Sequence, residues 1–312
     1  AAGEVLERPA SAVKELVENS LDANANSIDV IVRNGGKTEI SVADDGIGIH
    51  KEDLKKAISR HATSKLNEEN LDRIQTLGFR GEALSSIVAV AEVTLRTSAN
   101  NNSEGYELKI ISGEEKYCKP IKKKRGCLVR INNLFFSTPA RLKFLKSENY
   151  ESLLIKRLIQ KFALIFFDVK FNLRINDKKL ISAIPSNEKN WQDRFFRRVR
   201  DILGGEFLEN SVELSEKKNN INIFGLIGLP TFNYSNSNNQ FIFVNNRIIN
   251  DKVLNSIIRV AYRDFMFHDR FPQLILNIQC PHEYVDINVH PMKNEVRFED
   301  LSFLKSFIIS SI

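Results

Sequence analysis

The sequence predicts two α+β domains in a row, a fold class indicated by the chain length and by two kinds of apolar periodicity. Its 312 residues exceed one typical domain, since domains commonly hold about 100 to 200 residues. Segments with apolar residues at helical spacing alternate with short segments in which apolar and polar residues alternate. The polar run Pro185-Ser186-Asn187 separates two such sets. We therefore expect a first domain over 1–185 and a second, smaller α+β domain over 186–312.

The first domain opens with a predicted helix over 10–23, in which Val13, Leu16, Val17 and Leu21 recur at helical spacing. Two strands follow, around 28–32 and 40–42, and Asn34-Gly35-Gly36 supplies the turn between them. The remaining elements expected here are helices over 51–60 and 81–88, strands between 93 and 131, a long amphipathic helix over 139–166, and strands over 169–175 and 180–183. The polar segment 61–70 is long enough to be mobile.

The second domain mixes the same two patterns. Its expected elements are helices over 191–202 and 251–267 and strands over 221–229, 240–244 and 274–278. The Asn-rich stretch 233–239 is typical of an exposed loop, and Trp191 is expected in the core.

The composition excludes several classes of protein. No run approaches the roughly 18 apolar residues that a membrane helix needs. Cys118, Cys127 and Cys280 are odd in number and widely spaced, which excludes a disulfide framework and indicates a reducing, intracellular setting. The chain starts at Ala1 without methionine, so we expect further residues in front of it.

The formal net charge of +6 favours a polyanionic partner. Two basic runs concentrate this charge, over Lys122–Arg125 and within 194–200. Taken singly, each run is better explained as an ordinary solvated surface.

One face of the first helix carries Glu15, Asn19 and Asp22, which fall within about 60° of one another and opposite the apolar residues. A carboxylate that takes a proton from water and a side-chain oxygen one turn away that binds Mg²⁺ are what metal-assisted hydrolysis requires. An exposed polar helix face shows the same pattern, so both interpretations stand at this point.

Two glycine-containing loops favour the hydrolytic interpretation. In Asp44-Asp45-Gly46-Ile47-Gly48, the glycines let the backbone approach a flat ligand and the carboxylate can accept a hydrogen bond from an amino group. In the run 77–84, two glycines and an arginine precede a helix, whose free N–H groups and dipole favour phosphate.

Two familiar nucleotide motifs are absent from the sequence. Gly36-Lys37-Thr38 resembles the end of a Walker A loop, but position 31 is Ile31 and a strand is expected to follow. Gly46-Ile47-Gly48 lacks the third glycine of a dinucleotide fingerprint, because position 51 is Lys51. These departures exclude both motifs.

In order and spacing, the segments 15–23, 44–48 and 78–84 resemble the ATP site of the GHKL ATPases, which include type II topoisomerases, heat-shock chaperones, histidine kinases and MutL. Further segments are similar to MutL-type DNA mismatch-repair proteins in particular: Ala1-Ala2-Gly3-Glu4-Val5, Arg8-Pro9-Ala10, His61-Ala62-Thr63-Ser64-Lys65, the run 137–145 and the run 288–298. The resemblance implies a GHKL-type α/β sandwich followed by a ribosomal-protein-S5-like transducer domain.

The resemblance also implies roles for matching residues. Glu15 would be the general base that activates water, Asn19 the Mg²⁺ ligand, and Asp44 the acceptor for the adenine amino group. Lys293, from the second domain, would reach the γ-phosphate and couple hydrolysis to domain motion. The other residues implied at the ATP are Asp22 and Ala23, Gly46 and Gly48 beside the base, Thr63, Ser64 and Lys65 in a lid, Leu77, Gly78, Phe79, Arg80, Gly81 and Glu82 around the phosphates, and Cys127 in the pocket wall.

One departure from the family concerns the base pocket, where Gly126-Cys127 replaces the usual Gly-Thr and exchanges a hydroxyl for a thiol. The Asn245-Asn246-Arg247 turn matches a family turn associated with DNA binding, with Asn246 in place of glycine. It implies that Arg247 contacts the DNA backbone.

The partners implied by the resemblance are DNA, a MutS-type mismatch-recognition protein, downstream repair enzymes, and a second subunit in a homodimer or family heterodimer, with no membrane. The implied location is the cytoplasm and nucleoid of a bacterium or the nucleus of a eukaryote. Turnover should be slow, because lid and dimer must assemble first.

Three alternatives compete with a MutL-type ATPase. An ATP-dependent binding module would not need hydrolysis, and Glu15 argues against it. A topoisomerase ATPase domain shares the fold, but the segments 61–65 and 139–145 favour MutL. A histidine kinase is disfavoured, because no histidine-bearing dimerisation helix precedes the nucleotide site.

Overall fold

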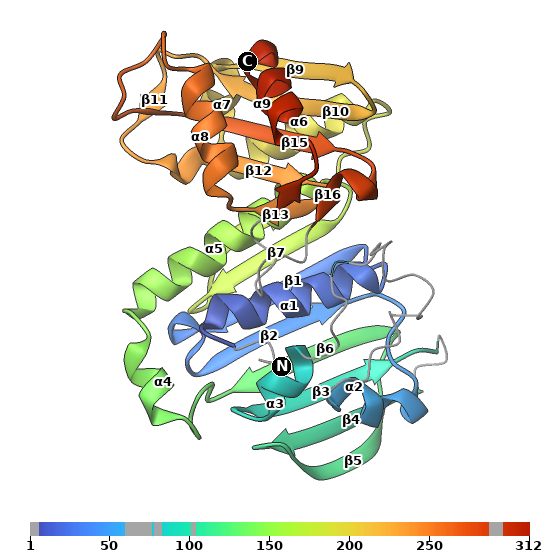
Figure 1. Cartoon of the computed structure of the whole chain (residues 1–312). Coiled ribbons are helices and arrows are strands. Elements are labelled where there is room, and N and C mark those ends of the chain that lie inside the picture. The colour runs from blue at the N-terminus through green and yellow to red at the C-terminus, as the bar shows by residue number, and fades with distance from the viewer. Residues whose placement is uncertain (1–5, 60–76, 78–82, 101–103, 287–295) are drawn as a thin grey trace. The chain divides into compact units, whose positions relative to one another are not determined.

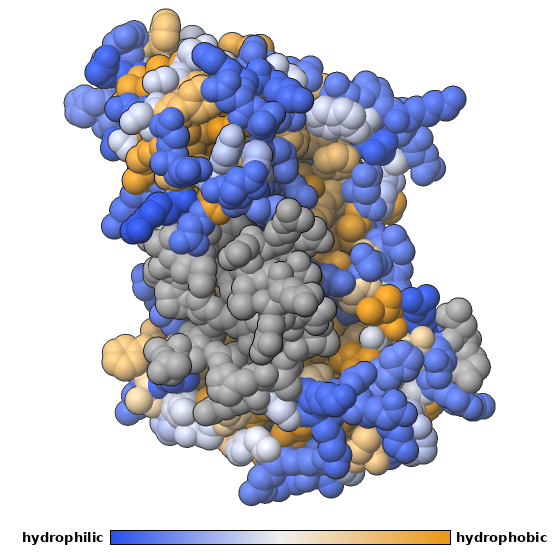
Figure 2. Space-filling view, turned by 45° about the vertical axis from the view of Figure 1, so that its right-hand side comes forward, coloured by the Kyte–Doolittle hydropathy of each residue, from blue (hydrophilic) through white to orange (hydrophobic). Residues whose placement is uncertain are grey.

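The computed structural model describes residues 6–59, 77, 83–100, 104–286 and 296–312. The chain divides into two compact units, Ala1–Ala163 with Phe167–Ser186 and Leu164–Phe166 with Asn187–Ile312. Each unit combines helices with one large sheet (Figure 1), so the predicted α+β class is confirmed. Figure 2 shows that hydrophilic side chains dominate the visible described surface. None of the described helices is both long and apolar enough to cross a membrane.

Unit 1 is built on an eight-stranded sheet in the order β5-β4-β3-β6-β2-β1-β7-β8. Strands β1 and β7 pair in parallel, and the other neighbours pair antiparallel. In Figure 1, α1 and α3 lie in front of this sheet. The strands are β1 Ser27–Arg33, β2 Glu39–Asp44, β3 Glu92–Ser98, β4 Glu104–Ile111, β5 Glu114–Lys122, β6 Gly126–Asn132, β7 Lys170–Ile175 and β8 Lys178–Ala183; the helices are α1 Pro9–Asp22, α2 Leu54–Ile58, α3 Ala83–Val88, α4 Pro139–Phe144 and α5 Glu148–Ile165.

Helix α1 confirms the predicted first helix. It starts at a proline, which suits the first helical turn, and buries Val13, Leu16 and Val17 as the spacing predicted. The predicted strand pair is confirmed as β1 and β2, with the turn Asn34–Gly36 between them. The first glycine-rich loop therefore begins at the last residue of β2, Asp44.

The predicted single helix over 139–166 is wrong, because the chain forms two helices there. Leu145 has an extended backbone after α4, and α5 begins at Glu148. The Ser147 hydroxyl accepts a hydrogen bond from Tyr150 N at 3.3 Å, and a Glu151 side-chain oxygen accepts one from Lys146 N at 3.1 Å. These bonds cap a new helix start, which the apolar periodicity does not reveal.

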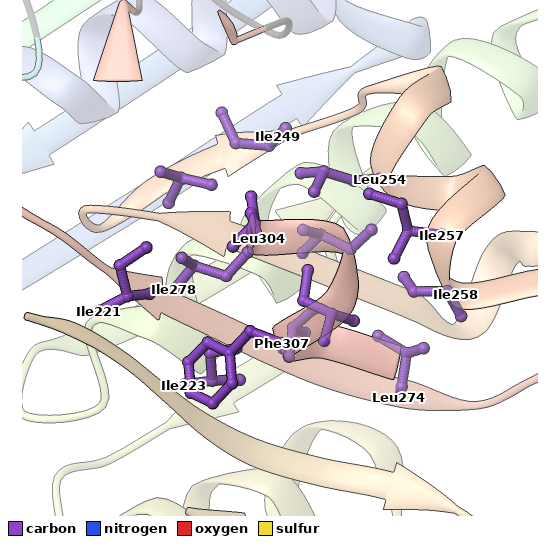
Figure 3. Close-up of a cluster of buried hydrophobic side chains, with 14 of the residues drawn as sticks. Ile221, Ile223, Ile249, Leu254, Ile257, Ile258, Leu274, Ile278, Leu304 and Phe307 are labelled. Atoms are coloured by element: carbon purple, nitrogen blue, oxygen red, sulfur yellow. The ribbon is translucent and has the colours of Figure 1, made fainter. Parts of the chain in front are cut away.

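Unit 2 contains a five-stranded sheet in the order β13-β12-β15-β10-β9. Figure 3 shows the apolar side chains of α8, α9 and one sheet face gathered into a single cluster, including Leu254, Ile278 and Phe307. The opposite face of the sheet packs against α6 and α7. For example, the Phe207 ring of α7 contacts the Phe241 ring of β12. The strands are β9 Ser211–Lys218, β10 Ile221–Gly228, β11 Asn233–Tyr234, β12 Gln240–Val244, β13 Arg247–Ile249, β14 Phe271–Pro272, β15 Leu274–Gln279, β16 Val285–Asp286 and β17 Arg297–Phe298; the helices are α6 Trp191–Leu203, α7 Gly205–Glu209, α8 Lys252–Ala261 and α9 Leu301–Ser311.

Three expectations for unit 2 need correction. The helix expected over 251–267 ends at Ala261, and the aromatic residues that extended the pattern, Phe265 and Phe267, are 71% and 83% exposed. Trp191 is not a core residue: it is 38% exposed, with its ring edge against Phe224. The stretch expected as a loop over 233–239 contains the short strand β11 and one helical turn.

Candidate nucleotide-binding site

The predicted site residues of unit 1 come from three neighbouring elements. Glu15, Asn19 and Asp22 lie on α1 and are all partly exposed. Asp44 ends β2, and Cys127 on β6 is its partner in the strand register. Thr63, Ser64, Lys65, Gly78, Phe79, Arg80, Gly81, Glu82 and Lys293 lie outside the described residues.

The carboxylate of Asp44 is held by three hydrogen bonds. Its Oδ2 accepts from the Ser20 hydroxyl at 2.8 Å, and its Oδ1 accepts from Gly46 N at 3.0 Å and Cys127 N at 3.2 Å. Burial raises the pKa of Asp44, and these three bonds lower it. A carboxylate can accept about four hydrogen bonds, so the three bonds leave acceptor capacity for a donor on a ligand.

The neighbouring carboxylate, that of Asp45, has a different structural role. One of its oxygens accepts hydrogen bonds from Asn26 N at 2.7 Å and Ser27 N at 2.9 Å. It therefore fixes the start of β1 rather than the glycine loop. Of two identical adjacent residues, Asp44 is the one bound into the loop and into β6.

Glycine is required in the loop after Asp44 for steric reasons. A Cβ on Gly46 would lie 2.7 Å from the carbonyl oxygen of Ala23, and one on Gly48 would lie 2.1 Å from the carbonyl oxygen of Ser98. Gly48 also has a φ of +71°, which disfavours other residues. The loop therefore packs backbone against backbone, between the end of α1 and the end of β3.

The end of α1 supports both predicted loops. Asp22 Oδ1 accepts a hydrogen bond from Leu77 N at 2.9 Å, at the start of the predicted phosphate-binding run. The carbonyl oxygen of Ala23 accepts one from Ile47 N at 3.0 Å. The three acidic or amide residues of α1, the Asp44 carboxylate and the start of the second loop are thus joined through one helix.

Two further polar residues belong to this network and were not predicted. Ser20 is buried on the sheet side of α1, and a polar residue among the apolar ones there is the signal that could have identified it. The Thr97 hydroxyl on β3 accepts from Ile49 N at 2.8 Å and donates to the carbonyl oxygen of Gly126 at 3.3 Å. Nothing in the local pattern around Thr97 indicates this role, because it depends on strand register.

The comparisons with known proteins agree with this geometry. Residues 7–128 match the family model described as histidine kinase-, DNA gyrase B-, and HSP90-like ATPase, and residues 199–312 match that of the DNA mismatch repair protein, C-terminal domain. The MutL mismatch-repair protein of Rickettsia bellii is 40% identical over all 312 residues. The chain belongs to the MutL family of DNA mismatch-repair proteins.

Two solved structures are similar in fold to this MutL-family chain. The MutL ATPase domain of Aquifex aeolicus, complexed with ADP, is 27% identical with a TM-score of 0.67, covering 89% of this chain and 93% of that one. The N-terminal domain of a DNA repair protein is 26% identical with a TM-score of 0.83, covering 98% and 93%. The predicted GHKL-type fold is thereby confirmed. The chain spans about half the length of the curated relatives it matches, 51% for the Rickettsia bellii protein.

In this MutL-family chain, burial keeps the Cys127 thiol protonated. Burial raises the pKa of Cys127 to about 12, and the nearby charge of Asp44 acts in the same direction. The side chain is therefore a protonated thiol at neutral pH. Cys127 contributes to the Asp44 network through its backbone N–H.

In unit 2, the predicted DNA-contacting residue lies just after a tight turn. Asn245 and Asn246 have φ values of 46° and 63°, the left-handed conformations that a two-residue hairpin turn needs. Arg247, the first residue of β13, is only 7% exposed.

The second basic run, on α6, is engaged mainly within its own unit. Arg198 is 2% exposed, and its guanidinium donates to the carbonyl oxygen of Phe166 at 3.5 Å, just beyond α5. Arg194 donates to the carbonyl oxygens of Glu188 and Lys189, and Arg197 pairs with the Glu188 carboxylate at 3.8 Å. Among the four arginines of this run, these three therefore have structural contacts.

Proposed function

We propose that this chain binds ATP together with Mg²⁺ and hydrolyses it slowly, as a nucleotide-driven switch that holds DNA and couples mismatch recognition to downstream repair. The observation that carries the proposal is the Asp44 carboxylate, which three donors hold at the end of β2. The loop that follows is fixed in place, because Gly46 N donates to this carboxylate and Gly46 and Gly48 pack against the backbone of Ala23 and Ser98. The same helix that holds Asp44 through Ser20 also carries Glu15 and Asn19.

In this proposal, Asp44 accepts a hydrogen bond from the amino group of adenine, and Gly46 and Gly48 line the base. Glu15 would take a proton from the attacking water, and Asn19 would supply a side-chain oxygen to Mg²⁺, which would stabilise negative charge on the phosphates. Asp22 supports the phosphate-binding backbone through its bond to Leu77 N. The lid residues Thr63 to Lys65, the backbone over 78–82 and Lys293 complete the site.

The fit of a magnesium ion rests on the donor set of α1. No cluster of three His, Cys, Asp or Glu side chains that could hold a metal is present among the described residues. Mg²⁺ usually keeps several waters and binds through few protein oxygens plus substrate phosphates. One amide oxygen, from Asn19, matches this preference, so the ion would arrive with the nucleotide.

The proposal is tested by measuring phosphate release with ATP and Mg²⁺ for the wild type, Glu15→Ala and the matched control Glu52→Ala, whose carboxylate is exposed on the surface. We expect hydrolysis to fall about 100-fold or more in Glu15→Ala, with ATP still bound, because a positioned base contributes about 10² to 10⁴ in rate. Glu52→Ala should match the wild type. Unchanged hydrolysis in Glu15→Ala would refute the assigned base.

For DNA, we propose a backbone contact through Arg247 in unit 2. Arg247 is only 7% exposed, so a contact with a phosphate must use this small exposed part of the residue. Arg247→Ala should weaken binding equally across sequences and reduce the salt slope by about one, whereas Arg263→Ala, at an exposed site, should change neither. A sequence-dependent loss would contradict a phosphate contact.

The partners of the whole protein are part of the same proposal. We propose a second subunit of the same family, a MutS-type mismatch-recognition protein and downstream repair enzymes. ATP binding would order the lid and bring the subunits together, and hydrolysis would reset them.

A further inference from the structure

The segment 123–125 crosses the edge of the unit 1 sheet beside the Asp44 carboxylate. It joins β5 to β6, which are separated in the sheet by β4 and β3. Lys122 pairs with Glu104 at one end of the crossing, and Gly126 pairs with Ser98 at the other. The segment thus passes over the ends of two strands and arrives at Cys127, the register partner of Asp44.

Lys123 differs from the other cations of this basic run. Lys122, Lys124 and Arg125 are exposed, whereas Lys123 is partly buried. A Cβ placed on Gly105 would lie 3.1 Å from the Lys123 Cβ, so the side chain starts against the sheet. Its ammonium donates to the carbonyl oxygen of Lys124 at 3.2 Å.

The electrostatic surroundings of Lys123 point the same way. Burial lowers the pKa of Lys123, while Cys127 and Asp44 raise it. Lys123 in turn lowers the pKa of Asp44. The geometry places Lys123 on the same side of the sheet end: a Cβ on Gly105 would meet both Lys123 Cβ and Ser98 Cβ, and the Ser98 carbonyl packs against Gly48 of the loop after Asp44.

The chemistry of adenine gives this cation a use. The amino group of adenine is a donor, and the ring nitrogens on either side of it, N1 and N7, are acceptors. An ionised carboxylate can only accept hydrogen bonds, and a thiol is a weak donor. A lysine ammonium offers three donors, so it can serve an acceptor that Asp44 cannot.

We infer that the Lys123 ammonium donates a hydrogen bond to a ring nitrogen that flanks the adenine amino group, making Lys123 a base-specificity residue in a chain where Cys127 replaces the family hydroxyl. This inference rests on the proposed ATP binding. It assigns a ligand to one member of a basic run whose other members face solvent. A lysine that merely balanced the charge of Asp44 would not distinguish one ring nitrogen from a carbon.

The test is equilibrium binding of ATP, 1-deaza-ATP and 7-deaza-ATP to the wild type, Lys123→Met and the exposed control Lys122→Met. We expect the wild type and Lys122→Met to bind one deaza analogue about tenfold more weakly than ATP, the loss of one hydrogen bond to a charged donor. Lys123→Met should bind ATP about tenfold more weakly and no longer discriminate against that analogue. Lys123→Arg should restore part of the discrimination.

Several outcomes would overturn the inference. Equal affinity of the wild type for ATP and both analogues would refute the hydrogen bond from Lys123 to the base but not the proposed ATP binding. Unchanged ATP affinity in Lys123→Met would do the same. Weaker binding of all three nucleotides by the same factor in Lys123→Met would assign Lys123 to charge balance. A wild type that binds no ATP would refute the proposed function itself. Hydrogen exchange of β4 and β6 amides verifies that the Lys123→Met variant is folded.

Discussion

Each unit of the chain buries part of a charged side chain, and the two charges differ in what surrounds them. In unit 1, Asp44 is bound by Ser20 and by two backbone N–H groups at the end of a strand, with acceptor capacity remaining. In unit 2, Arg198 is buried on α6, and its guanidinium donates to the backbone carbonyl of Phe166.

The difference shows how a charge that supports a fold can be told from one prepared for a ligand. Arg198 completes the hydrogen bonding of a neighbouring chain segment, so its removal should be felt in folding. Burial raises the pKa of Asp44, so ionisation of its carboxyl group opposes stability. A residue that is kept at a cost to stability is a candidate for function.

The largest expected effect is on folding, in Arg198→Ala. The lost packing of the side chain and the lost donor to Phe166 O should destabilise unit 2 by about 3 kcal/mol. Hydrogen exchange resolves the units: amides of β10 and β15 should exchange faster, with those of β1 and β2 unchanged. Equal protection of β10 and β15 in the variant and the wild type would mean that Arg198 contributes little to the fold.

Asp44→Asn should show the opposite combination. We expect ATP affinity to fall about 100-fold, or about 2.7 kcal/mol, because an amide replaces the charged acceptor. A group whose pKa is raised by folding binds protons more tightly in the native state, so stability falls as the pH rises through that range. Removing the charge should therefore leave thermal stability at pH 7 equal or higher, as calorimetry can establish. A marked loss of stability would place Asp44 with Arg198 as a fold-supporting charge.

Ser20→Ala should have an intermediate effect. Without the hydroxyl, Asp44 loses one of its three donors, and ATP affinity should fall about tenfold, or roughly 1.4 kcal/mol. The control is Ser41→Ala, a buried serine on the same strand as Asp44. If both variants weaken ATP binding equally, the effect comes from packing and not from the Ser20–Asp44 bond.

The smallest effect is expected for Arg200→Ala, which lies on α6 only two residues from the buried Arg198 but is exposed. Its removal should change the free energy of unfolding by no more than about 0.5 kcal/mol, as is usual for surface substitutions. Thermal unfolding and hydrogen exchange of unit 2 measure this. A loss as large as that of Arg198→Ala would show that burial does not distinguish the members of this run.

Much of the fold follows from local patterns in the sequence. The burial of Val13, Leu16 and Val17 on α1 and the β1–β2 hairpin are set by periodicity and turn residues, and both were predictable. The break between α4 and α5 was not, because it depends on the Ser147 and Glu151 capping bonds within an otherwise helical pattern. The spacing of apolar residues alone does not reveal such a cap.

The site shows the same division. The motif around Asp44 identified the loop, but not which carboxylate of the Asp44–Asp45 pair joins β6, since that depends on strand pairing. Likewise, Arg198 and Lys123 lie in basic runs whose members look equivalent in the sequence. Their separate surroundings come from residues distant in the chain: Arg198 donates to the carbonyl oxygen of Phe166, and Lys123 lies against Gly105.

The most direct test of the central claim compares the affinities of the wild-type chain for ATP and for inosine triphosphate by calorimetric titration with Mg²⁺. Inosine carries a carbonyl oxygen where adenine carries its amino group, so it presents an acceptor to the Asp44 carboxylate. We predict that ATP binds at least about tenfold more tightly than inosine triphosphate, and that Asp44→Asn reduces this preference. Equal affinity of the wild type for both nucleotides would contradict the assignment of Asp44 as the group that recognises the base.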